Sequence, residues 1–215
     1  MPALKRESGS DNIRAVSLLH FVTHPEVEVR PDVPVTQWEL SEQGLHRLQG
    51  LLGQRWVPHL TRVFCSTERK ALQTAQALGD ATGLLPSVEA DLGENDRSST
   101  GFLLPADFEA TADAFFARPK QSVRGWETAE AAQRRIVSAI SRLLVGAGRG
   151  DVAVVAHGAV GALLMCHLLG VAIDRAFDQP GQGSMYTVDM DTMNLVSGWQ
   201  RLPLPLGTQQ TALSD

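Results

Sequence analysis

Apolar residues along the chain form short, almost uninterrupted runs that are separated by stretches with helical periodicity. The two clearest runs cover residues 16–23 and 152–156, and a histidine follows each of them, His24 and His157. Runs of this kind are typical of strands buried on both faces, as in a parallel sheet. Shorter runs predict further strands at residues 62–65, 87–89, 185–189 and 195–200.

Helical periodicity occupies the spaces between these runs. Ser41 is a candidate N-cap for a helix with a leucine-rich face, and Gly170 is placed to end a later helix. Helices are predicted after Ser41, after Ser66 and at residues 108–116, 127–145 and 159–169. The alternation of strands and helices predicts an α/β fold, a three-layer α/β/α sandwich with a mostly parallel central sheet.

The length of 215 residues suits one domain with a full core. We predict that this domain covers residues 15–201, after a flexible segment at residues 1–14. Residues 91–126 are irregular and rich in Gly, Ser and Pro, and we expect them to cover the substrate. The proline-rich and polar end, residues 202–215, predicts a disordered tail.

Composition limits the class of protein, its partners and its cellular compartment. Hydrophobic residues make up 43% of the chain and charged residues 20%, which is ordinary for a globular protein. The net charge of −5 argues against nucleic acid or an anionic membrane as a partner. The N terminus lacks the apolar core of a signal peptide, and no apolar stretch is long enough to cross a bilayer, so we expect a cytoplasmic protein. The sequence does not determine the oligomeric state, and a homo-oligomer is one possibility.

The two histidines carry the candidate chemistry. In parallel sheets the functional residues lie in the crevice beyond the carboxyl ends of the strands, so His24 and His157 can meet there. Arg69 falls in the first turn of the helix that follows residues 62–65, where its guanidinium can bind a phosphate through two hydrogen bonds. Helix N-termini add a partial positive charge. The sequence therefore predicts a pocket for a phosphoryl group.

Short motifs along the chain support this interpretation. They are Thr23-His24-Pro25, Leu40-Ser41-Glu42-Gln43-Gly44, the segment Ser66–Ala75, Glu94 after Leu92-Gly93, and Ala156-His157-Gly158. In this order they resemble the signatures of the histidine phosphatase superfamily, also called phosphoglycerate mutase-like. Those signatures are Arg-His-Gly, Leu-Thr/Ser-x-x-Gly, Ser-x-x-x-Arg-Ala-x-Gln-Thr-Ala, a loop Glu and Ser/Ala-His-Gly. The third is matched through Arg69, with one spacing difference before the arginine.

The resemblance implies a phosphoglycerate mutase-like fold and a phosphatase that needs neither a metal nor another cofactor. His24 would attack phosphorus and carry the phosphoryl group as a phosphohistidine. Glu94 would act as general acid and then as general base. His157, Arg69 and Gly158 would hold the phosphoryl oxygens.

The first signature departs from the family, because Thr23 stands in place of its arginine and Pro25 in place of its glycine. The loss of one preorganised donor typically costs ~3–4 kcal/mol of transition-state stabilisation. Thr23 stays a predicted phosphate-binding residue. Arg97 is the first candidate for a substitute cation, and Arg30 is the second.

We therefore predict a phosphohydrolase that acts on a small phosphomonoester through His24. The main alternative is a catalytically weakened module that binds phosphate esters or regulates, and a lesser one is a phosphomutase. Asp91 or Asp96 could take the role of Glu94. Trp38 and Trp126 either line the mouth of the pocket or pack in the core. The substrate itself cannot be named from the sequence.

Overall fold

A six-stranded sheet organises residues 16–146 and 148–205, which the computed structural model describes. The strands are β1 Leu18–Thr23, β2 Leu60–Cys65, β3 Ser87–Val88, β4 Asp151–Ala156, β5 Ser184–Asp189 and β6 Leu195–Arg201. Their order is β3-β2-β4-β1-β5-β6. The pairs β3–β2, β2–β4 and β4–β1 are parallel, and β5 and β6 join antiparallel at one edge. The predicted, mostly parallel α/β sheet is confirmed.

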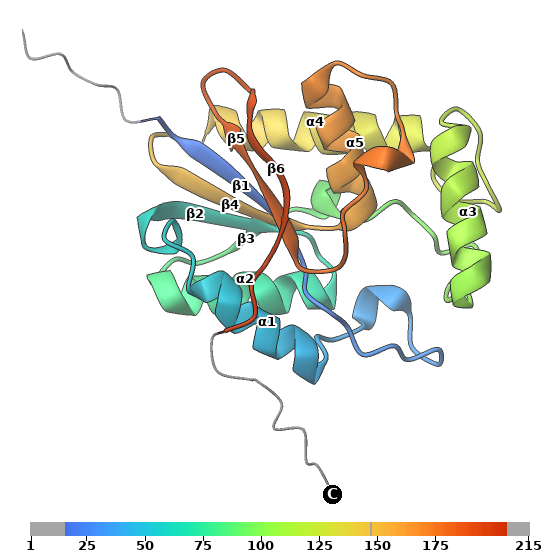
Figure 1. Ribbon diagram of the computed structural model, residues 1–215, viewed down its shortest axis with the longest axis horizontal. Coiled ribbons are helices and arrows are strands. Elements are labelled where there is room, and N and C mark those ends of the chain that lie inside the picture. The colour runs from blue at the N-terminus through green and yellow to red at the C-terminus, as the bar shows by residue number, and fades with distance from the viewer. Residues whose placement is uncertain (1–15, 147, 206–215) are drawn as a thin grey trace, which may run out of the picture.

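Helices cover both faces of the sheet (Figure 1). The helices are α1 Glu42–Leu52, α2 Arg69–Thr82, α3 Pro105–Ala117, α4 Ala129–Val145 and α5 Gly158–Leu169. Helices α1 and α2 lie on one side, α4 and α5 lie on the other, and α3 stands at one end of these layers. Short 3₁₀ helices occupy Val35–Gln37, Val57–His59, Ala90–Leu92 and Arg175–Phe177. No helix among the described residues is long and apolar enough to cross a membrane.

The core has two halves, one on each face of the sheet. Phe21 packs with residues of α3, α4 and α5, whereas its neighbour Val22 packs with residues of α1 and α2. Val154 and Val155 divide in the same way on β4. Alternate side chains of a strand point to opposite faces, so burial on both faces explains why the apolar runs are nearly continuous.

The helix boundaries follow local signals within a few residues. The hydroxyl of Ser41 accepts the N–H of Gly44 at the start of α1, as predicted for its N-cap. Thr128 caps α4 in the same way, which places the start of this helix two residues later than predicted. Gly170 ends α5 in the left-handed conformation, with φ of 67°.

The predicted boundary of the C-terminal tail is wrong. Leu202 is 1% exposed, and its N–H donates to the carbonyl of Gly183 at 2.8 Å. The Arg47 guanidinium donates to the Leu202 carbonyl at 2.7 Å. Composition placed Leu202 in the tail because of the prolines and polar residues that follow it, whereas its buried side chain and its hydrogen bonds make it part of the domain. The predicted segment 1–14 and residues 206–215 lie outside the described residues.

A charged cluster anchors the loop that follows β1. The Glu26 carboxylate accepts hydrogen bonds from Arg47 at 2.8 and 2.9 Å and from Arg201 at 2.7 Å. A Cβ at Gly44 would lie 2.0 Å from the Glu26 carbonyl oxygen, so only glycine allows α1 to approach this loop. The loop that begins with His24 is therefore fixed against α1.

Candidate active site

His24 and His157 meet at the carboxyl edge of the sheet. They follow β1 and β4, which are parallel neighbours with Thr23 opposite Ala156. The His24 N–H donates to the Ala156 carbonyl at 3.2 Å, so the two strand ends are held together. The ring centroids are 5.3 Å apart with an interplanar angle of 62°. Both residues are buried, and the rings meet as the strand ends predict.

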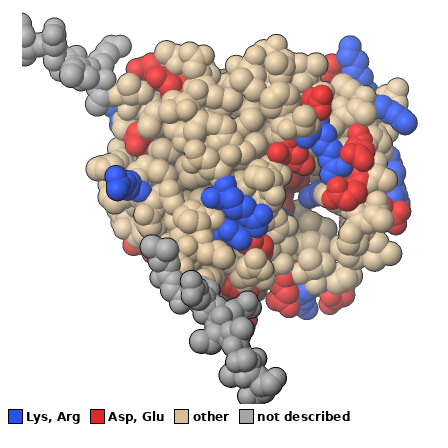
Figure 2. All heavy atoms as spheres, viewed as in Figure 1, with Lys and Arg blue, Asp and Glu red and all other residues tan. Residues whose placement is uncertain are grey.

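Two cavities share His24. The apolar cavity, about 330 Å³, is bordered mainly by aliphatic and aromatic residues: Val27, Val29, Val35, Trp38, Phe102, Leu103, Pro105 and Phe108. The polar cavity, about 250 Å³, is lined by polar groups together with aromatic rings: Glu94, Asn95, Gly158, Arg175, Asp178, Gln179, Phe115, Phe116 and Trp126. Both are lined by His24, Arg97, Phe108, Glu109 and Gln182, so they are two arms of one cleft. Figure 2 shows the surface hollowed beside α3, with acidic and basic side chains at the rim.

The ring of His24 is held in one tautomer. Its Nδ1 lies 2.8 Å from the Pro25 carbonyl oxygen. Because a carbonyl oxygen only accepts, Nδ1 carries the proton and donates it. Burial lowers the pKa of His24 well below its usual value, and the nearby His157 and Lys70 act in the same direction. The ring is neutral at neutral pH, and its Nε2 keeps a free lone pair.

His157 is supported from one side of its ring. Its Nε2 lies 2.7 Å from the Ser66 hydroxyl and 3.3 Å from a carboxylate oxygen of Glu68. Its Nδ1 is buried and has no hydrogen-bond partner among the described residues. Burial lowers the pKa of His157 well below its usual value, and the charge of Lys70 adds to this shift. An unpartnered buried nitrogen is costly, and a ligand oxygen would satisfy it.

Lys70 is a site residue that the sequence analysis missed. Its side chain is 3% exposed, forms an ion pair with Glu68 and donates to the Val35 carbonyl at 2.9 Å. It also lines the apolar cavity together with His24. In the signature Ser-x-x-x-Arg the arginine is the fifth position, which is Lys70 when Ser66 is the first. A strict count of the spacing would have found it.

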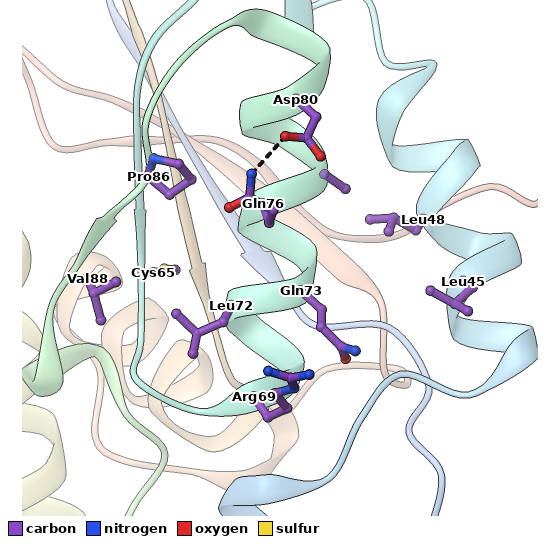
Figure 3. A pocket seen from close by; sticks show the side chains of 11 residues that line it. Leu45, Leu48, Cys65, Arg69, Leu72, Gln73, Gln76, Asp80, Pro86 and Val88 are labelled. Carbon is purple, nitrogen blue, oxygen red and sulfur yellow. Dashed lines mark hydrogen bonds between the residues drawn. The ribbon is translucent and has the colours of Figure 1, made fainter.

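Arg69 lies outside this group, which corrects its predicted place in the phosphate pocket. Its side chain is 53% exposed and forms an ion pair with Glu39 at 2.9 Å. Figure 3 shows Arg69 at the start of α2, lining a groove with Leu72 and with Leu45 of α1. Consecutive residues of an α-helix point ~100° apart, and here Lys70 points to the buried side of α2 while Arg69 points to its exposed side.

Glu94 reaches the site from the loop after the 3₁₀ helix Ala90–Leu92. Its carboxylate accepts the N–H groups of Ala159 and Val160, in the first turn of α5, at 3.3 and 3.1 Å. Its own N–H donates to Glu68 at 3.0 Å. Burial raises the pKa of the Glu94 carboxyl, and the Glu68 carboxylate acts in the same direction. Glu94 also lines the polar cavity with His24.

The two aspartates considered in place of Glu94 lie elsewhere. Asp91 forms an ion pair with Arg142 at 2.6 Å on the surface. Asp96 is exposed and accepts the N–H of Ser98 at 2.8 Å. Neither of them lines the two cavities that contain His24.

Arg97 is a cation that lines both arms of the cleft. Its guanidinium carbon lies 5.3 Å from the ring centroid of Phe108 and 5.6 Å from that of Trp126. Stacking on these rings orients the guanidinium without neutralising its charge. Arg97 lines both cavities with His24. Arg30, the second candidate, is 54% exposed, pairs within its own loop and lines neither.

Thr23 does not face the cleft, which corrects its predicted phosphate contact. It is fully buried, its hydroxyl donates to Gln179 at 2.6 Å, and it accepts the N–H of Ser184 at 3.0 Å. Gln179, which the sequence did not indicate, thereby reaches the polar cavity. It packs on Gly158, where a Cβ would lie 2.4 Å from its side-chain nitrogen. Gly158 itself lines the polar cavity at the start of α5.

The described residues contain no group of three or more His, Cys, Asp or Glu side chains that could hold a metal ion.

Asn95 is 3% exposed, and its side-chain nitrogen has no partner within the described part of the chain. Because Asn95 lines the polar cavity, this free donor is available to a polar ligand there.

Comparison with known protein families places the chain, with this site, in a known superfamily. The profile of the histidine phosphatase superfamily (branch 1) matches residues 19–197, so the chain belongs to this superfamily. Its membership supports a phosphohydrolase-type function. No curated protein sequence matches the chain.

Solved structures share the fold. Mycobacterial glucosyl-3-phosphoglycerate phosphatase is 22% identical with a TM-score of 0.69, and the match covers 87% of this chain and 100% of that one. YhfR of Bacillus stearothermophilus is 19% identical with a TM-score of 0.68, covering 83% and 94%. A phosphoserine phosphatase variant from Entamoeba histolytica, in complex with phosphoserine, is 14% identical with a TM-score of 0.71, covering 85% and 96%.

Proposed function

We propose that the chain hydrolyses a small phosphomonoester through a phosphohistidine on His24, without a metal or another cofactor. The observation that carries this proposal is the free Nε2 of His24. The Pro25 carbonyl holds the proton on Nδ1, and the ring lines the cleft and packs against the buried ring of His157. A neutral imidazole with a fixed lone pair is a competent nucleophile.

In the first step the Nε2 lone pair of His24 attacks phosphorus and forms a P–N bond. The bond between phosphorus and the ester oxygen breaks, and its electron pair leaves with that oxygen. Glu94 donates its proton to the departing oxygen, a role that is supported by its place in the polar cavity with His24 and by the direction in which burial shifts its pKa, upward. The products of this step are the free alcohol and phosphorylated His24.

Charge on the phosphoryl group would be balanced by three features. An oxygen would supply the missing partner of His157 Nδ1, and a nearby dianion would raise the pKa of this histidine. The Glu68 carboxylate, 3.3 Å from the other nitrogen, would stabilise the resulting imidazolium. Arg97 and the N terminus of α5 at Gly158 would bind the remaining oxygens.

In the second step a water oxygen attacks phosphorus, and the P–N bond breaks with its electron pair returning to His24. Glu94, now a carboxylate, accepts the proton of the attacking water. Inorganic phosphate leaves, and the acid is restored for the next cycle.

A phosphate-ester-binding module without turnover is the second candidate. Two observations favour it, since the charge of Lys70 is offset by Glu68 and the Thr23 hydroxyl is engaged by Gln179. The donors that remain free could bind a phosphate ester in its ground state. Catalysis would require additional stabilisation that is specific to the transition state.

The test is turnover of p-nitrophenyl phosphate between pH 5 and 8, with and without a chelator. We expect phosphate release that is lost in His24→Ala and retained in the control His59→Ala, an exposed histidine away from the cleft. Radiolabelled substrate quenched in denaturant should leave label on the wild type that is stable in base and labile in acid. Phosphate binding without turnover would support the binding module, and full activity of His24→Ala would contradict the mechanism.

A further inference from the structure

The apolar cavity has a composition that the phosphoryl chemistry does not require. Its walls come from the loop after β1 and from residues 97–109, and its volume is about 330 Å³. Trp38 comes from the first wall and Phe102 from the second, and their rings pack against each other with centroids 5.8 Å apart and planes tilted by 54°. Trp38 is held in place because its indole N–H donates to the carbonyls of Arg30 and Val33. The walls are thus built around aromatic surfaces.

The polar groups of this cavity do not suit a second anionic group on the substrate. Lys70 is already paired with Glu68. Glu109 contributes a carboxylate that would repel an anion, although it pairs with Arg175 at the surface. The side-chain carbonyl of Gln182 accepts the N–H of Val27 at 3.1 Å. Arg97 is the remaining cation among the described residues that line this cavity, and the phosphoryl group requires it.

The polar cavity carries more polar groups, although aromatic residues also line it. It contains Glu94, the start of α5, the Gln179 amide and the unpartnered nitrogen of Asn95. These groups match a phosphoryl group and the water that attacks it. The rest of the substrate is therefore left to the apolar cavity.

We propose that the apolar cavity binds the alcohol part of the phosphomonoester and selects an uncharged apolar group, with a flat ring packed against the paired rings of Trp38 and Phe102. This inference rests on the proposed function. The cavity volume falls at the lower end of the range for small-molecule sites, which suits one ring and a short linker. Sugar phosphates and phosphorylated acids would leave their polar groups facing hydrocarbon without partners, at a cost in binding.

The test compares 2-phenylethyl phosphate with ethyl phosphate, and with glycerol phosphate as the polar ester. The leaving groups of the first two are primary alcohols of similar acidity, so a difference in kcat/KM reports on binding of the ring. We expect the phenylethyl ester to be hydrolysed with a kcat/KM ~10- to 100-fold above that of the ethyl ester.

Phe102→Ala should reduce the ratio between these two esters by roughly tenfold, because it removes one wall of the cavity. Leu45→Ala is the matched control, since Leu45 is a half-exposed apolar residue that lines the separate groove beside α2. Turnover of all three esters without preference, or a preference for glycerol phosphate, would overturn this inference alone. Absence of turnover with every ester would overturn the proposed function, and this inference with it.

Discussion

Arg69 and Lys70 begin the same helix and carry the same charge, yet they belong to different regions of the molecule. Arg69 lies on the outer side of α2, where its side chain is 53% exposed and pairs with the equally exposed Glu39. Lys70 lies on the inner side, 3% exposed, and pairs with the buried Glu68 beside His157. The phase of the helix, more than the charge or its position in a motif, decides which cation belongs to the site.

The two pairs differ in energy as well as in place. An exposed pair such as Arg69–Glu39 typically contributes ~0–1 kcal/mol, because water solvates both charges. A buried pair is different, since removing one partner leaves the other charge unpaired, typically at a cost of ~3–5 kcal/mol. Glu68 would be left in this state, next to His157 and the N–H of Glu94.

The largest expected effect comes from replacing each of the two cations, Lys70 and Arg69, with alanine in turn. Lys70→Ala should lower kcat/KM for p-nitrophenyl phosphate by ~10²–10³, because Lys70 lines the cleft with His24 and balances the charge of Glu68 next to His157. The same variant should lower the free energy of unfolding by ~3–5 kcal/mol. Arg69→Ala should change both by little, within about twofold in rate and ~1 kcal/mol in stability. Steady-state kinetics and denaturant unfolding measure these effects. Equal losses in the two variants would break the comparison.

A second effect concerns the cation that replaces the missing arginine. Arg97→Ala should weaken phosphate binding and lower kcat/KM by ~10- to 100-fold, because the guanidinium on Phe108 is lost from both arms of the cleft. Arg30→Ala is the control, since its side chain lines neither cavity. Phosphate titration by calorimetry and the same kinetic assay give the result. An unchanged Arg97→Ala variant would show that another group supplies the charge.

The smallest effects concern protonation. Burial lowers the pKa of His20 to about 4 and the pKa values of His24 and His157 well below 6.5. Between those values and pH 6.5 the unfolded chain binds more protons than the folded one, so stability falls as the pH is lowered. His20 alone should reduce the free energy of unfolding by about 2 kcal/mol between pH 7 and pH 5.

Denaturant unfolding at the two pH values tests this, and NMR titration separates the histidines. Because the charge of Lys70 depresses the pKa of His24, Lys70→Ala should raise that pKa, whereas Arg69→Ala should leave it in place. Stability that stays constant from pH 7 to pH 5 would contradict the burial of these rings as neutral groups.

Much of the fold was predictable because each central strand is buried on both faces and therefore consists of a continuous apolar run. The ends of two such runs also located His24 and His157, and β1 and β4 do pair with Thr23 opposite Ala156. Gln179 could not be found in this way. It is 156 positions from Thr23 and reaches the cleft through a hydrogen bond that only the folded chain can form.

The sequence by itself determined the strands, the helices, the histidines at the strand ends and the likeness to one superfamily, because these features depend on local periodicity and on motif order. The tertiary structure decided the rest: that Lys70 faces the site and Arg69 does not, that Thr23 holds Gln179, and that Arg97 enters the cleft on a base of Phe108 and Trp126. The physical reason is direction. A side chain acts where it points, and that is settled by helix phase and by partners distant along the chain.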